Sequence, residues 1–157
     1  RHPTRLSRLL LASTLAWSDA ANVYIAQSWS AAQQAGGPGL RFDISLPWLF
    51  SSRFFVSSAQ MLPDLRTIAA TVDWPGVERI LAGIREHDAR SWLDEIRVPT
   101  HIIVGSEDRL TPLYQSELLH QGIAGAHLHV FARCGHLPPM EVPQETTAVL
   151  RDWLQAP

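Results

Sequence analysis

The sequence predicts an α/β protein in which half of an open parallel sheet carries a long helical insertion. Three short apolar runs, near residues 6–13, 100–105 and 127–131, are typical of buried strands. Helical patterns separate these runs, and strands separated by helices form parallel sheets with right-handed crossovers. Residues 1–14 and 98–157 are therefore assigned to the sheet part, and residues 15–97 to the helical insertion.

Composition narrows the class of protein. The chain has 157 residues, of which 46% are hydrophobic and 18% charged, as in an ordinary folded domain. A net charge of −2 provides no attraction to nucleic acid or to an anionic membrane, and no apolar run is long enough for a membrane span. The single cysteine, Cys134, excludes an internal disulfide and gives no support for an oxidising compartment. The expected location is the cytoplasm.

The first predicted strand, Leu6–Ser13, follows a helix end at His2-Pro3. Its continuous apolar run favours a central parallel strand that is covered on both faces. Arginines before the run give it some likeness to a secretory signal, but the apolar core is short and no Met opens the chain. Ser18 or Asp19 then caps a helix that is expected to end near Ala35.

The insertion continues with patterns of two kinds. Alternating apolar residues favour a strand over 40–46, at Leu40, Phe42, Ile44 and Leu46. Helical spacing follows Pro63 and is clearest over 77–84, where one apolar face contains Val77, Ile80, Leu81 and Ile84. The water-facing side of that helix is expected to hold Glu78, Arg79, Arg85 and Glu86. A shorter helix with Trp92, Leu93 and Ile96 ends before Val98-Pro99.

After Pro99 the pattern alternates between strand and helix. Thr111 caps a helix that has Pro112 at its first position and ends at Gly122. Pro143 opens the last helix, whose inward residues are expected to be Val149, Leu150, Trp153 and Leu154.

Asp108 and His136 are the candidate catalytic residues, because each follows a predicted strand. Open α/β sheets bind ligands outside the carboxyl ends of their strands. An acid followed by a His is the order of the last two members of a hydrolytic triad, whose nucleophile comes earlier in the chain. No Gly-x-Ser-x-Gly occurs in this sequence. We therefore expect a nucleophile outside it, and a C-terminal fragment that is inactive by itself.

Neighbouring residues offer alternatives to this pair. Glu107 is a rival acid, although adjacent side chains point apart and only one can face His136. Cys134 is read as a small buried residue rather than a nucleophile. His127 and His129 share one face of a strand but have no evident third ligand, so no metal site is expected.

Several motifs together resemble the C-terminal portion of α/β-hydrolase-fold enzymes, most closely the 3-oxoadipate enol-lactonase group and its ester-hydrolase relatives. The motifs are Val98-Pro99-Thr100, Gly105 to Pro112, Gly135-His136-Leu137-Pro138 with Glu141 and Pro143, and also His2 to Thr14, Pro47 to Phe50 and His87-Asp88-x-Arg90. The resemblance implies that Asp108 is the triad acid and His136 the base. The resemblance also implies that residues 40–46 form a helix or loop within a cap, although their alternating apolar residues favour a strand. We expect the helix or loop.

The expected function is hydrolysis of a carboxylic ester or lactone, a small-molecule substrate, without a cofactor. Substrate contacts are expected from Trp48, Phe50, Leu110 and Leu137. Relatives of the same fold that hydrolyse C–C bonds, haloalkanes or epoxides are the alternatives, the last two with an Asp nucleophile. A different class of alternative is a non-catalytic remnant, or a subunit that a partner completes; the sequence does not indicate an oligomeric state.

Overall fold

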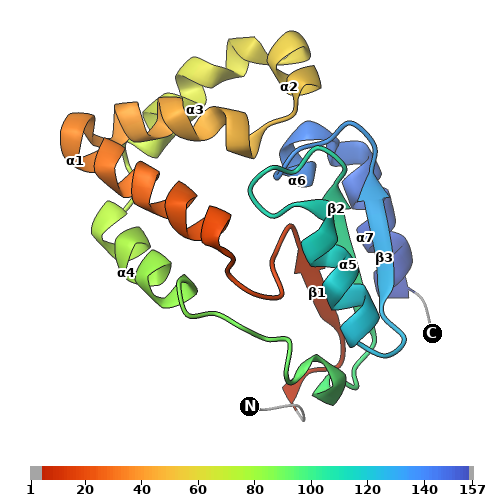
Figure 1. The fold of residues 1–157 in the computed structure, drawn as a ribbon. Coiled ribbons are helices and arrows are strands. Elements are labelled where there is room, and N and C mark those ends of the chain that lie inside the picture. Colours follow the sequence, from red (N-terminus) through yellow and green to blue (C-terminus); the bar gives the residue numbers. More distant parts are fainter. Residues whose placement is uncertain (1–4, 156–157) are drawn as a thin grey trace.

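The computed structural model describes residues 5–155, so the helix end expected at His2-Pro3 lies outside the described residues. Its sheet has three parallel strands in the order β1 (Leu9–Ala12), β2 (Thr100–Gly105) and β3 (His127–Phe131). The helices are α1 (Ala20–Leu49), α2 (Ser52–Ser57), α3 (Leu62–Ala69), α4 (Trp74–Ile84), α5 (Leu113–Gly122), α6 (Pro138–Glu141) and α7 (Pro143–Gln155), with 3-10 turns at Ala59–Met61 and Leu93–Glu95. Helices α1–α4 form a layer beside the sheet (Figure 1).

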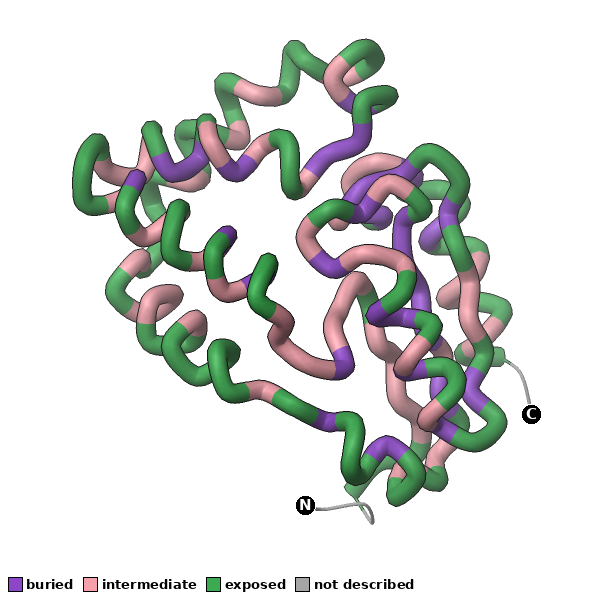
Figure 2. The backbone as a smooth tube through the Cα atoms, viewed as in Figure 1, coloured by how far each residue is buried: buried purple, intermediate pink, exposed green. Residues whose placement is uncertain are grey.

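Helices cover both faces of the sheet. Successive residues of a strand point to opposite sides, so each strand has side chains on both of these faces. On one face, Ile102 packs in a buried cluster with Leu119 and Ile123 from α5 and its C-terminal cap. On the other, Ile103 and Phe131 pack with Val149 of α7. Figure 2 shows this core as the buried stretch that runs along β2. The predicted parallel sheet with helical crossovers is confirmed.

Strand β1 is shorter and less central than predicted. Leu10 and Leu11 contact the clusters on opposite faces, so both faces are covered as expected. However, β1 pairs only with β2, and among the described residues it is an edge strand whose three leucines are half-buried. Its second edge therefore offers backbone hydrogen-bonding groups to a further strand.

Helix α1 consists of two helical stretches that meet at a kink close to the helix end predicted near Ala35. Asp19 and Asn22 form a capping box at its start, as expected for Asp19. Gly37 has a φ of 68°, which kinks the chain, and Pro38 then opens a second helical stretch that reaches Leu49. Residues 40–46 are thus helical, as the family resemblance implies, and the strand indicated by their alternation is wrong.

Arg41 explains why α1 and α4 pack together. Its side chain is 3% exposed and forms an ion pair with Glu78 of α4. Its guanidinium also lies 4.4 Å from the centre of the Trp74 ring, a cation–π contact. Glu78 therefore contacts the neighbouring helix, although its side chain, predicted on the water-facing side, remains 37% exposed. Burying one arginine required a carboxylate from a helix far along the chain.

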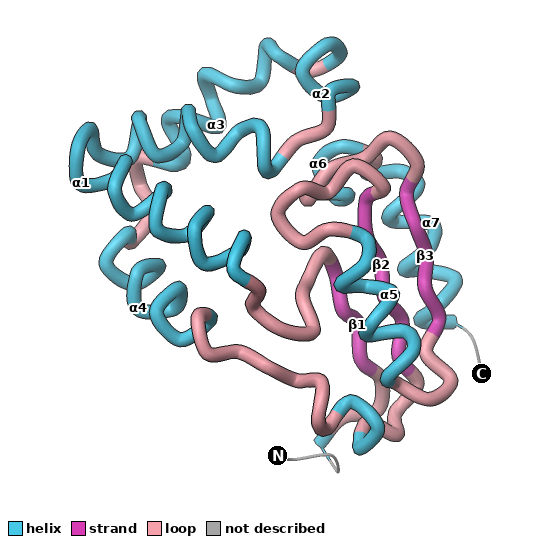
Figure 3. The backbone as a smooth tube through the Cα atoms, in the orientation of Figure 1, coloured by secondary structure: helices cyan, strands magenta, loops and turns pink. Residues whose placement is uncertain are grey.

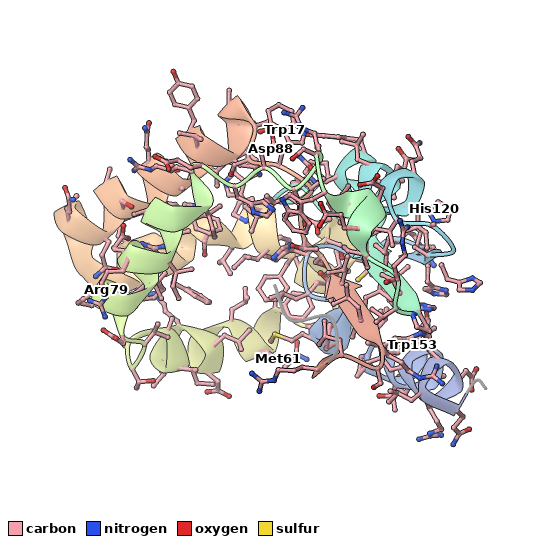
Figure 4. The ribbon with its side chains drawn as sticks, turned by 90° about the horizontal axis from the view of Figure 1, so that it is seen from below. Trp17, Met61, Arg79, Asp88, His120 and Trp153 are labelled. Atoms are coloured by element: carbon pink, nitrogen blue, oxygen red, sulfur yellow. The ribbon has the colours of Figure 1, made fainter. Side chains whose placement is uncertain are left out.

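The helical layer leaves and rejoins the sheet part at one place. Trp17 forms an antiparallel bridge with Asp88, and Figure 4 shows the two residues close together. The N–H of Ala89 donates to the carbonyl of Ala16 at 2.7 Å, within the core cluster under α5. The Arg90 guanidinium lies 4.3 Å from the centre of the Trp17 ring and pairs with the Asp88 carboxylate.

Three smaller expectations from the sequence also differ from the structure. The helix predicted around Trp92 is only the 3-10 turn. Pro112 rather than Thr111 occupies the N-cap position of α5, where no side chain forms a capping hydrogen bond. Leu154 is 62% exposed, because it lies on the outer side of α7 near the chain end. Within residues 5–155, every helix is too short or too polar to cross a lipid bilayer.

Candidate active site

The loops after β2 and β3 lie at the same end of the sheet, where Figure 3 shows them beside α6. Asp108 belongs to the first loop and His136 to the second. Because β2 and β3 are parallel neighbours, their carboxyl ends are adjacent. His136 Nδ1 consequently lies 2.9 Å from Asp108 Oδ2, a hydrogen bond or ion pair across the two loops.

Buried donors hold the Asp108 carboxylate in one orientation. Its side chain is fully buried, and Oδ1 accepts the backbone N–H groups of Leu110 and Thr111, each at 2.9 Å. Oδ2 accepts the Thr111 hydroxyl at 2.9 Å in addition to His136. Three neutral donors therefore compensate the burial of the carboxylate. Thr111, which the sequence suggested as a helix cap, instead helps to fix the acid.

The pairing also sets the chemistry of the His136 ring. A carboxylate only accepts hydrogen bonds, so Nδ1 carries the proton and Nε2 is left as the basic nitrogen. The side chain of His136 is 17% exposed. A base held by a buried acid, with one ring nitrogen available, can take a proton from a nucleophile and return it to a leaving group.

Glu107, the rival acid, is directed elsewhere. Its carboxylate accepts the N–H of Ser52 at 3.4 Å, and its own N–H donates to the carbonyl of Cys134 at 2.8 Å. Neither contact involves His136. Asp108 is therefore the acid that meets the base.

Cys134 is a buried residue of the core. It is 0% exposed, and burial, with the nearby carboxylates of Glu141 and Asp108, raises the pKa of its thiol to about 12. A thiol with that pKa is almost fully protonated near neutral pH, whereas the thiolate is the nucleophile.

The two loops are packed against each other without spare room. A Cβ on Gly105 would lie 2.1 Å from the carbonyl oxygen of Gly135 and 2.2 Å from that of Cys134. Ser106 Oγ accepts the N–H of Arg133 at 2.9 Å, and Arg133 has a φ of 53°. The absence of a side chain at Gly105 thus permits the approach of the His136 loop.

A cavity of about 340 Å³ lies between the sheet end and the helical layer, and His136 lines it. Its apolar walls come mostly from α1 and α4: Ile25, Ala26, Trp29, Leu81 and Ile84, with Leu15 and Leu110. Its polar lining consists of Ser13, Thr14, Asn22, His87, Thr111 and His136. The basic histidine therefore faces a mainly apolar space.

The predicted substrate contacts fall in different places. Leu110 lines this cavity, whereas Trp48, Phe50 and Leu137 do not. Phe50 is 3% exposed and its ring stacks on Phe54 with centroids 4.1 Å apart, while Trp48 is 36% exposed. Sequence analysis did not identify Trp29 and His87 as residues that line the cavity. The apolar face over residues 77–84 was predicted, but such a face is equally typical of core packing.

The strand histidines do not assemble a metal site. Among residues 5–155, no group of three or more His, Cys, Asp or Glu side chains is arranged to hold an ion. His127 and His101 have ring centroids 6.4 Å apart, and His129 packs on the Phe131 ring. Burial and the two other histidines lower the pKa of His101.

Comparisons with known proteins identify the family and the fold. A model of the family described as alpha/beta hydrolase matches residues 3–149. The pimeloyl-[acyl-carrier protein] methyl ester esterase of Neisseria meningitidis is 29% identical over 96 residues, which are 61% of this chain and 36% of the esterase. The chain thus spans about a third of that relative's length.

Solved structures match over nearly the whole chain. An alpha/beta hydrolase enzyme from a Medee basin deep-sea metagenome library aligns with a TM-score of 0.91 at 25% identity, covering 100% of this chain and 59% of that one. The enol-lactonase from Burkholderia xenovorans aligns with a TM-score of 0.88 at 24% identity, covering 99% and 59%. The resemblance drawn from the sequence motifs is confirmed.

Proposed function

Because the chain belongs to the alpha/beta hydrolase family, we propose that it supplies the acid and the base of an enzyme that hydrolyses a carboxylic ester or lactone. The observation that carries the proposal is the 2.9 Å contact between His136 Nδ1 and the buried Asp108 carboxylate, at the carboxyl end of adjacent parallel strands. The esterase relative and the enol-lactonase neighbour support this class of bond.

His136 acts first as a base and then as an acid. Its Nε2 removes the proton from a serine hydroxyl, whose oxygen attacks the ester carbonyl carbon, and then protonates the departing alkoxide oxygen. It next removes a proton from water, which attacks the acyl-enzyme and releases the carboxylic acid and the serine. Asp108 keeps Nδ1 protonated and stabilises the imidazolium that forms in each step. The serine comes from residues outside this sequence, which contains no Gly-x-Ser-x-Gly.

The helical layer serves as a cap that forms one wall of the substrate site. The cavity's apolar lining from α1 and α4 suits an uncharged, apolar part of the substrate, either its acyl chain or its alcohol. Leu110 and Trp29 contact that part, while Asn22 and Thr111 lie among the polar residues near the base. This assigns the cap to substrate selection and the two loops to chemistry.

The test is a pair of substitutions in the protein translated from the complete reading frame around this sequence. Asp108→Asn should lower kcat for a short-chain ester by about 10⁴-fold with a small change in KM, because the wrong tautomer of His136 is favoured. Glu107→Gln is the matched control, and should stay within a few-fold of wild type. Loss of activity in the control together with an active Asp108→Asn would reject the assignment. A wild-type protein that cleaves no ester or lactone would reject the function.

A further inference from the structure

Glu141 is the centre of a hydrogen-bond cluster behind the catalytic pair. It is the last residue of α6, and its side chain reaches back to the loop that carries His136. Oε1 accepts the N–H of Gly135 at 3.0 Å and that of Ser51 at 3.2 Å. Oε2 accepts the Ser51 hydroxyl. One carboxylate thus binds the residue before His136 and a residue of the helical layer.

Ser51 is completely buried at the joint between α1 and α2. Its hydroxyl oxygen also accepts the N–H of Phe54 at 3.2 Å and so caps α2. The space around the cluster is filled, since a Cβ on Gly135 would lie 2.7 Å from both Glu141 Oε1 and the Ser51 nitrogen. The carboxylate is therefore held at both of its oxygens.

Further contacts link the same joint to the two catalytic loops. The N–H of His136 donates to the carbonyl of Leu49 at 3.0 Å. Arg109, beside the acid, donates to the carbonyl of Pro47 at 3.1 Å. The chain from 47 to 52 is thus attached to both sides of the catalytic pair, and Glu141 supplies a partly buried side-chain link to the His136 loop.

We propose that Glu141 is a positioning residue, which holds the His136 ring at hydrogen-bonding distance from Asp108 by fixing Gly135 and Ser51. This inference rests on the proposed function for its kinetic consequences, but the geometry of the ring can be measured without turnover. Small displacements of a catalytic group lower the rate strongly, by about 10²-fold for 1 Å. The apolar walls of the cavity come mostly from α1 and α4 rather than from this ring, so its displacement should change kcat more than KM.

The test compares Glu141→Ala and Glu141→Gln, with Glu145→Ala as the control from an exposed position four residues further on. In the protein from the complete reading frame, Glu141→Ala should lower kcat about 10²-fold and leave KM within threefold. Glu141→Gln should recover most of the rate, because its amide oxygen still accepts the Gly135 N–H and its amide group can donate to the Ser51 oxygen. Glu145→Ala should match wild type.

A spectroscopic measurement separates this proposal from the function. The low-field proton NMR signal of His136 Nδ1–H should weaken or shift in Glu141→Ala and return in Glu141→Gln. If the wild-type protein hydrolyses no ester, the function fails while this signal still tests the positioning.

An unchanged signal and kcat in a folded Glu141→Ala variant would overturn the proposal. If that variant does not fold, Ser51→Ala decides, since it removes one of the three donors. It should lower kcat severalfold at constant KM, and a wild-type rate there would also overturn the proposal.

Discussion

Gly105→Ala should separate Asp108 from His136 by pushing their loops apart. The new Cβ would lie 2.1 and 2.2 Å from the carbonyl oxygens of Gly135 and Cys134, whereas ordinary contact begins at 3.4 Å. These are backbone atoms, so no side-chain rotation relieves the overlap, and the loop that carries His136 must move by more than an ångström. We expect a loss of about 3 kcal/mol in the free energy of unfolding, at the upper end for overpacking, and a fall in kcat of about 10²-fold.

The assay pairs urea denaturation, followed by tryptophan fluorescence, with ester hydrolysis by the protein from the complete reading frame. Gly83→Ala is the control, because nothing lies within 4 Å of its added Cβ in the exposed part of α4. That substitution should raise the free energy of unfolding by about 0.5–1 kcal/mol and leave kcat unchanged, since alanine favours a helix over glycine. A Gly105→Ala protein with wild-type stability and kcat would refute the described packing of the two loops.

Two further predictions concern charged residues of the helical layer and its junction. Arg41→Met should lower the free energy of unfolding by about 2–3 kcal/mol in urea denaturation, because Glu78 loses its buried cation, whereas the exposed Arg79→Met control should change it by less than about 0.5 kcal/mol. Hydrogen bonds from Arg90 lower the pKa of Asp88 to about 2, so Arg90→Ala should raise that pKa towards its ordinary value in an NMR titration. The lowered pKa means that the pair's contribution to stability is complete above about pH 4 and is lost as the pH falls towards 2. A titration midpoint of Asp88 that Arg90→Ala leaves unmoved would contradict the pairing.

The pairing of Asp108 with His136 could be predicted from the sequence because it depends only on the order of strands and helices along the chain. A strand followed by Asp108, one crossover helix, and a strand followed by His136 place both residues at one edge of a parallel sheet. Thr111 was harder to assign, since a Thr before Pro is equally typical of a helix cap. Its actual role depends on how the loop turns back onto Asp108, which pattern alone does not determine.

The helical layer was less predictable for a different reason. Over residues 40–46, alternating apolar residues fit a strand, yet the buried side of this helix contains Arg41 and Ser45. A sequence pattern counts arginine as exposed, and its burial is tolerable here because it pairs with Glu78 and lies over the Trp74 ring. The cavity lining is likewise shared by α1 and α4, whose relative placement depends on the kink at Gly37.

The bridge between Trp17 and Asp88 brings the two ends of the helical layer together, which is the topology of an inserted segment that can be exchanged. Its two connections to the sheet part meet at one point, where the N–H of Ser18 donates to the carbonyl of His87 at 2.8 Å. Segments whose ends are adjacent can be exchanged or inserted with little change to the host. Under the proposed function, chimeras that graft the layer of a relative between these two residues would therefore alter selectivity while keeping the loops that carry Asp108 and His136. The graft must also supply partners for Glu141 and the N–H of His136, which the native layer provides through Ser51 and Leu49.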